Sequence, residues 1–323
     1  MWRYIVRRTL WAIFLFLAVT FLTYVIFFVA PSDPAKLAAG KLASPEQVKQ
    51  VAKYLHLDKP VWEQYVLWLK QLVVDGSLGK SFVNREPVND IVKSAAPVTA
   101  SLVFGGAVLW LLVSIPIGVL SALKPRSLLD RGAMMFVLVG ISAHPVWIGL
   151  ILAFVFGYKL GWTPITGYCD FFNPSVGSTC GGPVDWAYHM VLPWCTFALL
   201  FSALYVRLIR ANVMETMSED FVRTARAKGV PPAQVMRSHI LRNSMLPVVT
   251  ILGMDIALAL GGAIFTESIF GLPGLGRWII LSYEKVDLPV IVGIVVFSTI
   301  CIIVFNLIVD CLYAVIDPRI RLA

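Results

Sequence analysis

Charged residues are scarce in this sequence, since only 14% of its 323 residues are Asp, Glu, Lys or Arg. A soluble domain typically has about 25%. Hydrophobic residues make up 58% of the chain, and the mean hydropathy is +0.79. A soluble core of this size cannot cover so many apolar side chains. The composition therefore excludes a water-soluble globular domain.

Several patterns that carry chemistry are also missing. The sequence has no Gly-x-x-x-x-Gly-Lys-Ser/Thr motif and no His-Glu-x-x-His motif, which excludes a P-loop ATPase and a zinc protease of that type. Paired catalytic groups at membrane depth, which an intramembrane protease needs, are not evident either. An ion-driven carrier usually shows internal repeats and several buried charges, and alternating ten-residue segments of a β-barrel are absent.

Long apolar runs predict six transmembrane helices. A helix needs roughly 20 apolar residues to cross ~30 Å of hydrocarbon, and it satisfies its own backbone hydrogen bonds there. Pro116 interrupts one run, and His144-Pro145 predicts a kink in another. Six segments meet the length requirement: Thr9–Ala30, Val98–Leu123, Gly132–Tyr158, Trp186–Val206, Met245–Phe265 and Leu288–Val309. The first run is too long for the apolar part of a signal peptide, so we expect an uncleaved span.

Basic residues in the short loops predict the orientation of these spans. Lys and Arg gather in the first eight residues, in residues 124–131, in residues 207–242 and at the C-terminus. With six spans, these four regions lie on one side, so both termini are predicted to be cytoplasmic. The net charge of +8 follows from this topology and does not favour a nucleic-acid partner.

Two cysteines, Cys169 and Cys180, lie in the third loop, which this topology places outside the cell. An oxidised pair is expected there, although two unpaired loop cysteines remain the alternative. No metal site is expected, because clustered His or acidic ligands do not accompany them.

The cytoplasmic segment 207–244 contains a patterned element. Glu219 and Asp220 precede a stretch of Ala, Arg and Lys that ends at Gly229, and acid at the start with base at the end favours a short helix. Gly229 is expected to stop this helix in a left-handed cap. Pro231 and Pro232 then permit a second helix. The sequence predicts a helix–Gly–helix element, with apolar Phe221, Val222, Ala225 and Val230 available for insertion into a partner.

The stretch Asp220–Gly229, together with Leu241-Arg242-Asn243 and Leu246-Pro247, resembles the coupling loop of ABC importer permeases. The general family pattern is Glu-Ala-Ala, three residues, then Gly. Here Arg223-Thr224-Ala225 stands at the first three positions, which is typical of the subfamily that imports dipeptides, oligopeptides and nickel (the B-type dipeptide permease).

Further motifs extend the resemblance over nearly the whole chain. Ser32 replaces the usual Gly in the first of them. In order they are Ala30-Pro-Ser-Asp-Pro34, His56-Leu-Asp-Lys-Pro60, Asp75-Gly-Ser-Leu-Gly-Lys-Ser-Phe82, Thr266-Glu-Ser-Ile-Phe-Gly-Leu-Pro-Gly-Leu-Gly276 and Asp317-Pro-Arg-Ile-Arg321.

The resemblance implies a type I ABC importer permease fold, all-α with six transmembrane helices and a helical external insertion after the first span. Residues 1–30 would hold the cytoplasmic N-terminal end and the first span, residues 31–97 the external loop or subdomain, and residues 98–323 the core permease domain with its coupling loop 207–244.

The resemblance also implies the role of the chain. It would form the translocation pathway of an importer for short peptides in a bacterial or archaeal plasma membrane, with import of nickel or another small solute as the alternative. It would not be an enzyme and would hold no cofactor, since ATP is used by partner subunits. The implied partners are a homologous second permease subunit, cytoplasmic ABC ATPase subunits and an external substrate-binding protein. The residues implied to couple to the ATPase are Asp220, Phe221, Arg223, Thr224, Ala225, Arg226, Lys228 and Gly229.

Two acidic residues are candidates for a pathway or gate. Asp255 lies inside the fifth span, where a carboxylate is costly and usually faces the bundle interior or an aqueous path. A structural hydrogen bond or ion pair between helices explains it equally well. Glu267 follows that span outside, where a role at the outer gate, a role in docking the binding protein and a purely structural loop remain open.

Overall fold

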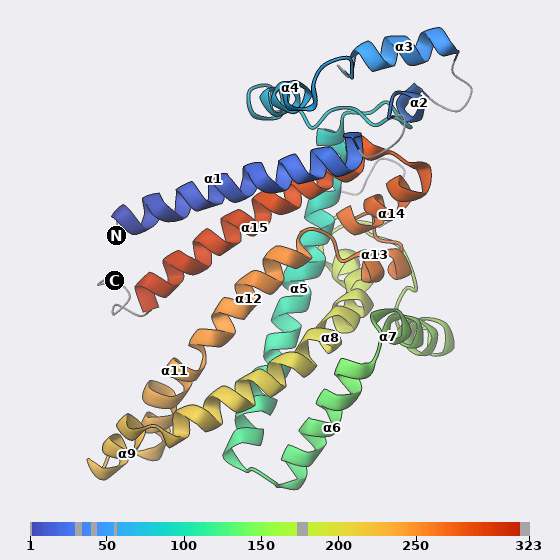
Figure 1. Cartoon of the computed structure of the whole chain (residues 1–323). Coiled ribbons are helices and arrows are strands. Elements are labelled where there is room, and N and C mark those ends of the chain that lie inside the picture. Colours follow the sequence, from blue (N-terminus) through green and yellow to red (C-terminus); the bar gives the residue numbers. More distant parts are fainter. Residues whose placement is uncertain (1, 30–33, 40–43, 55–56, 173–179, 317–323) are drawn as a thin grey trace.

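The computed structural model describes residues 2–29, 34–39, 44–54, 57–172 and 180–316 (Figure 1). These residues are mostly helical. An isolated antiparallel β-bridge joins Lys80 and Pro87. The prediction of an all-helical fold with membrane-spanning helices is confirmed for these residues. The motifs at residues 30–33, 56 and 317–321 lie outside the described residues.

Four described helices are each long and apolar enough to cross a membrane. Each contains most or all of one predicted apolar run. The helix that contains Pro116 continues through that residue, so the proline does not end it. The four are α1 (Trp2–Tyr24) with its π-helical extension η1 (Val25–Val29), α5 (Val88–Leu123), α8 (Pro183–Ser218) and α15 (Leu288–Ile316).

Three bent helix pairs could each form a further crossing, which brings the number of candidate spans in the described part of the chain to between four and seven. In the first pair, α6 (Leu128–Ser142) meets α7 (Pro145–Leu152) and η2 (Ala153–Lys159) with a bend of 106°. In the second, α10 (Pro232–Gln234), η3 (Val235–Leu241) and α11 (Arg242–Ser244) meet α12 (Leu246–Ala259) with a bend of 43°. In the third, α13 (Ile264–Phe270) meets α14 (Leu275–Lys285) with a bend of 87°.

Two predicted spans are therefore not single helices. The segment 132–158 breaks at His144-Pro145 instead of kinking, because Pro145 has no N–H to continue the helix and His144 caps α7 by accepting the N–H of Val146 at 3.3 Å. The segment 245–265 ends as a helix at Ala259, shortly before Gly262 takes a φ of +128°.

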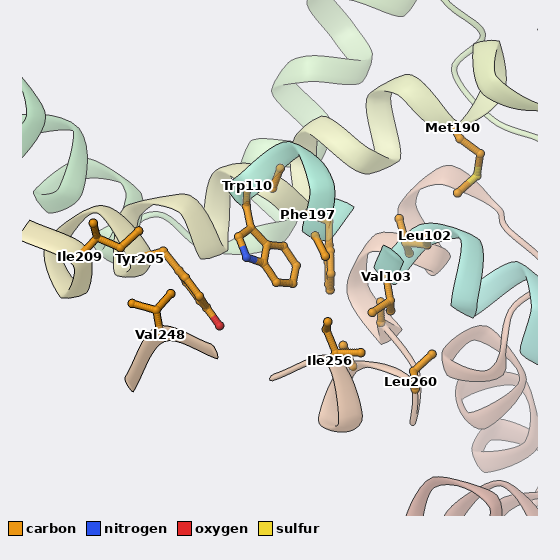
Figure 2. Close-up of a cluster of buried hydrophobic side chains, with 14 of the residues drawn as sticks. Leu102, Val103, Trp110, Met190, Phe197, Tyr205, Ile209, Val248, Ile256 and Leu260 are labelled. Atoms are coloured by element: carbon orange, nitrogen blue, oxygen red, sulfur yellow. The ribbon is translucent and has the colours of Figure 1, made fainter. Parts of the chain in front are cut away.

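The main core forms where α5 packs along α8, with α12 beside them. Trp110 of α5 stacks on Phe201 of α8 at 4.6 Å between ring centroids and lies beside Phe197 and Tyr205 (Figure 2). The two helices approach closely because Gly106 faces Phe197, where a Cβ would lie 2.7 Å from the ring. This packing fixes α8, the helix that leads to the helix–Gly–helix segment at residues 219–244.

Three short helices follow the first span: α2 (Pro34–Ala39), α3 (Pro45–Tyr54) and α4 (Val61–Val73). Helices α3 and α4 cover most of residues 45–74. The segment is tied to the start of α15, since Phe82 N–H donates to Asp287 at 2.8 Å. The domain boundaries at residues 30 and 97 stay predictions, and α5 runs continuously across residue 97.

Candidate functional site

A short helix, α9 (Asp220–Ala227), follows α8 directly. Asp220 lies in its first turn and Arg226 in its last, which matches the positive and negative ends of the helix dipole. The chain then turns back and enters α10, where Pro232 occupies the first helical position. Figure 1 places α9 at the far end of α8 from α13 and α14. The predicted helix–Gly–helix element is confirmed. We call residues 219–244 the cytoplasmic element, because the basic residues of this segment predict that side of the membrane.

Gly229 ends α9 in the left-handed conformation that the sequence predicts, with a φ of +76°. Its N–H donates to the carbonyl of Arg226 at 3.0 Å, and the N–H of Val230 donates to the carbonyl of Ala225 at 3.2 Å. These two bonds make up a Schellman motif, which satisfies carbonyls at the helix end. Gly229 therefore sets the direction in which the chain leaves α9.

The inward face of α9 belongs to the core of this chain. Val222 and Ala225 are buried in the main cluster with Val235 and Ile240 of η3. The expectation that Val222 and Ala225 insert into a partner is wrong, because the chain itself covers both side chains. Their burial anchors α9 against η3, so that the helix is held as a rigid projection.

The outward face of α9 carries the other predicted coupling residues. The ion pair between Arg223 and Asp220 has an N···O distance of 3.5 Å and is weak, because both side chains are well exposed. The guanidinium therefore remains open to carboxylates of a partner. The exposed positions are Asp220, Phe221, Arg223, Thr224, Arg226, Lys228 and Gly229.

An ion pair fixes α8 shortly before it reaches α9. The Nε of Arg210 lies 2.7 Å from Oδ1 of Asp130, and its Nη2 lies 3.0 Å from Oδ2. Asp130 also accepts hydrogen bonds from the Ser121 hydroxyl and from the N–H of Arg126. These bonds, the one from Arg210 foremost, hold the pKa of Asp130 well below its usual range.

Sequence reasoning did not find the pair of Asp130 and Arg210. The two residues are 80 positions apart. In the sequence, Arg210 was interpreted only as one of the basic residues that predict which side of the membrane the segment 207–242 faces. The one available signal was an acidic residue, Asp130, within the basic segment 124–131.

Asp255 lies on α12 and is half-buried. Its Oδ2 accepts a hydrogen bond of 2.7 Å from the hydroxyl of Tyr205, which is almost fully buried on α8. Met254 and Leu258, its neighbours on α12, are exposed. The hydrogen bond between helices that the structural alternative requires is thus present, while the pathway role stays a prediction.

Glu267 is fully buried on α13. Its carboxylate accepts the Thr99 hydroxyl at 2.8 Å and the N–H groups of Ala263 at 3.2 Å and Arg277 at 3.0 Å. Arg277 lies in the first turn of α14, whose N–H groups have no partner within the helix. In this structure the buried carboxylate of Glu267 caps α14. Its role at a gate stays a prediction.

Cys169 and Cys180 form a disulfide in the structure, with 5.5 Å between their Cα atoms. Cys169 is buried, and its Sγ lies 3.2 Å from Nδ1 of His189 at the start of α8. Whether the bridge forms in the cell remains a prediction.

The predicted site residues thus lie in separate places. Helix α9 and helix α13, which carries Glu267, lie toward opposite ends of α12, the helix that carries Asp255 (Figure 1). Within the part of the chain that the structure describes, no group of three or more His, Cys, Asp or Glu side chains is arranged to hold a metal ion.

Comparison with known protein families gives two matches that together cover almost the whole chain. The model described as "Binding-protein-dependent transport system inner membrane component" matches residues 114–322. The model described as "Binding-prot-dependent transport system membrane comp, N-term" matches residues 1–103.

Curated proteins of similar sequence extend over the full chain. The oligopeptide transport system permease protein AppB of Bacillus subtilis is 38% identical over 319 residues, which are 98% of this chain and 99% of that protein. The dipeptide transport system permease protein DppB of Escherichia coli is 37% identical over 337 residues, 99% of both. A putative peptide transport system permease protein of Brucella abortus is 35% identical over 317 residues, 98% of both.

Proposed function

This chain belongs to the family of binding-protein-dependent transport system inner membrane components, and we propose on that premise that it forms part of the translocation pathway of an ATP-driven importer of short peptides. As a member it is a multi-pass inner membrane permease component. The chain itself hydrolyses nothing and holds no cofactor in this proposal, since the ATP is used by cytoplasmic partner subunits.

The cytoplasmic element is the observation that carries the proposal. Its inward face packs into the core through Val222 and Ala225. Its outward face exposes the apolar Phe221 and three cationic side chains, those of Arg223, Arg226 and Lys228. A rigid projection of this kind can transmit the closure of an ATPase to the spans, because α8 leads into it and α12 leads out of it. ATP binding would then shift the balance between inward- and outward-facing states.

The topology that fits this role has six spans with both termini in the cytoplasm. α1 and α15 lie side by side, and the start of α1 and the end of α15 lie at the same end of the molecule (Figure 1). This arrangement supports an even number of crossings. We further propose a type I importer permease fold in a bacterial or archaeal plasma membrane, with residues 31–97 as an external helical insertion.

A homologous second permease would complete the pathway. The face of α12 that points away from this chain is apolar, with Ile251, Met254 and Leu258 exposed around Asp255. Such a face needs lipid or a second chain to cover it. The complete importer would also include ATPase subunits and an external substrate-binding protein.

Short peptides are the favoured substrate class. AppB and DppB are named for oligopeptides and dipeptides, and the Brucella protein is named for peptides. These names favour peptides over the alternative of nickel.

Uptake into proteoliposomes tests the proposal. This chain would be reconstituted with its second permease, ATPase and binding protein, and the entry of a labelled dipeptide would be followed. We expect uptake only with internal ATP and external binding protein. Uptake by this chain alone, driven by an ion gradient, would reject the proposal.

A further inference from the structure

Helix α4 lies beside the outer part of the first span and not beyond its end. The hydroxyl of Tyr65 donates to the carbonyl of Leu17 at 3.1 Å and lies 2.9 Å from the Thr20 hydroxyl. Leu17 is twelve residues before Val29, the end of η1, which is roughly 18 Å at 1.5 Å per residue. Half of a ~30 Å hydrocarbon core is ~15 Å. One face of α4 therefore reaches into the depth that lipid tails occupy.

The contact between α4 and the first span is extensive and aromatic. Tyr65 packs edge-on against Phe21, with 5.1 Å between ring centroids, and Trp68 lies 5.6 Å from Tyr24. These rings form one buried cluster with Phe28. A contact of this kind holds α4 at a fixed depth along α1.

A second apolar stripe runs along α4 next to the packed face. Trp62, Val66 and Val73 lie at helical spacing, within about 40° of one another at 100° per residue. They are 64%, 58% and 66% exposed. The described part of the chain offers nothing to cover them.

Lys70 and Gln71 are the exposed polar residues of α4 away from this stripe. Both line a cavity of about 750 Å³ that also contacts Lys80 and Arg85. Gln64 is buried on the packed face, where it accepts from Tyr24 and donates to the carbonyl of Lys59. α4 thus has a packed face, an exposed apolar face and a polar side that carries Lys70 and Gln71.

We infer that α4 is an interfacial helix embedded in the outer leaflet of the membrane, with Trp62, Val66 and Val73 in contact with lipid acyl chains. This division of faces is the pattern of helices that lie in the plane of the interface. The adjacent span presents exposed apolar side chains at the same depth, since Leu22 and Ile26 are exposed to 60% and 50%. Lys70 can extend from the polar side toward the headgroups.

Site-specific photo-crosslinking tests the inference in the assembled importer in its own membrane. p-Benzoylphenylalanine would replace Val66 or Val73, one per variant, and each variant would be kept only if it retains peptide uptake. Gln71 is the matched control on the polar face of the same helix. Leu22 in the first span calibrates the yield for a side chain in lipid.

Intact mass after irradiation would read out the adducts. We expect phospholipid adducts at positions 66 and 73 that approach the yield at position 22 and exceed the yield at position 71 by about tenfold, since the polar face lies in water. Adducts to the second permease or to the binding protein at both positions would overturn the inference. So would yields at 66 and 73 that do not exceed the yield at 71.

Discussion

The hydroxyl of Tyr205 on α8 donates a hydrogen bond of 2.7 Å to the carboxylate of Asp255 on α12. α8 leads into the cytoplasmic element and α12 leads out of it, so this bond joins the two stems of the element inside the membrane. The amide of Asn212 adds a second link, since it donates to the carbonyl of Ser244 at 3.4 Å. A movement of the element must therefore move both stems together.

Tyr205→Phe should weaken this link. The change leaves the carboxylate of Asp255 without its donor, and an unsatisfied polar group of this kind costs about 1–3 kcal/mol. Asp255→Asn should cost less, because the amide oxygen can still accept from Tyr205. Thermal unfolding of the purified complex measures both. If Asp255→Asn abolishes uptake at unchanged stability, the residue acts in the pathway; normal uptake with lowered stability would assign it to the structural bond alone.

Gly229→Ala should strain the end of α9. A Cβ at this position would meet no atom within 4 Å, so the cost comes from the left-handed backbone alone, about 1–2 kcal/mol. We expect less uptake per ATP hydrolysed, with normal membrane insertion. Gly132→Ala is the control, because that glycine lies within α6 and also has open space; it should be neutral or stabilising by up to about 1 kcal/mol. Equal coupling in the two variants would argue against a role for the cap.

Glu267→Gln should destabilise the turn between α13 and α14. The side-chain amide would replace one of the two acceptor oxygens with a donor, which would face the N–H of either Ala263 or Arg277. Losing such a bond in a buried place costs about 1–3 kcal/mol. Glu284→Gln, at an exposed position on α14, should change little. Thermal unfolding compares the two. Identical stabilities would show that the carboxylate does not hold the turn.

The cap at Gly229 and the buried carboxylate of Glu267 differ in how far the sequence could predict them. The cap depends on neighbours within five residues, so the pattern of acid, base, Gly and Pro was sufficient. Glu267 meets Thr99 across 168 positions, and a single sequence holds no signal for that approach. The spans followed from apolar length, whereas the break at His144-Pro145 was underestimated, because a proline pattern does not reveal the size of a bend.

The orientation of α9 was only half predictable. Its helical spacing did not indicate which apolar residues face the core, so Val222 and Ala225 were assigned to a partner together with Phe221. Their burial depends on Val235 and Ile240, which the turn at Gly229 brings back against α9. The pair of Asp130 and Arg210 was missed for the same reason, since its partners come from different helices.

Acid should weaken the packing of the C-terminal end of α8 through Asp130. The Arg210 guanidinium holds the pKa of Asp130 below the usual value of about 3.9. The pair therefore stabilises the fold fully above that pH, and its contribution is lost as the pH falls through the lowered pKa of the folded state.

Asp130→Asn should thus lower stability at neutral pH by up to about 3 kcal/mol, and the gap to the unmodified protein should narrow in acid. Thermal unfolding from pH 7 to about pH 2 follows this narrowing, which should begin near the unfolded pKa of about 3.9 and increase below it. Arg210→Lys is the companion variant, because it keeps the charge but loses the two-pronged contact. A gap that widens in acid would contradict the assignment.

The most direct test of the central claim is the identity of the protein that touches α9. p-Benzoylphenylalanine would replace Phe221 on α9 or Tyr283 on α14, both exposed aromatic residues at opposite ends of the molecule. Irradiation of the assembled importer should join position 221 to the ATPase subunit and should give no ATPase adduct at position 283. An ATPase adduct at 283, with none at 221, would contradict the account.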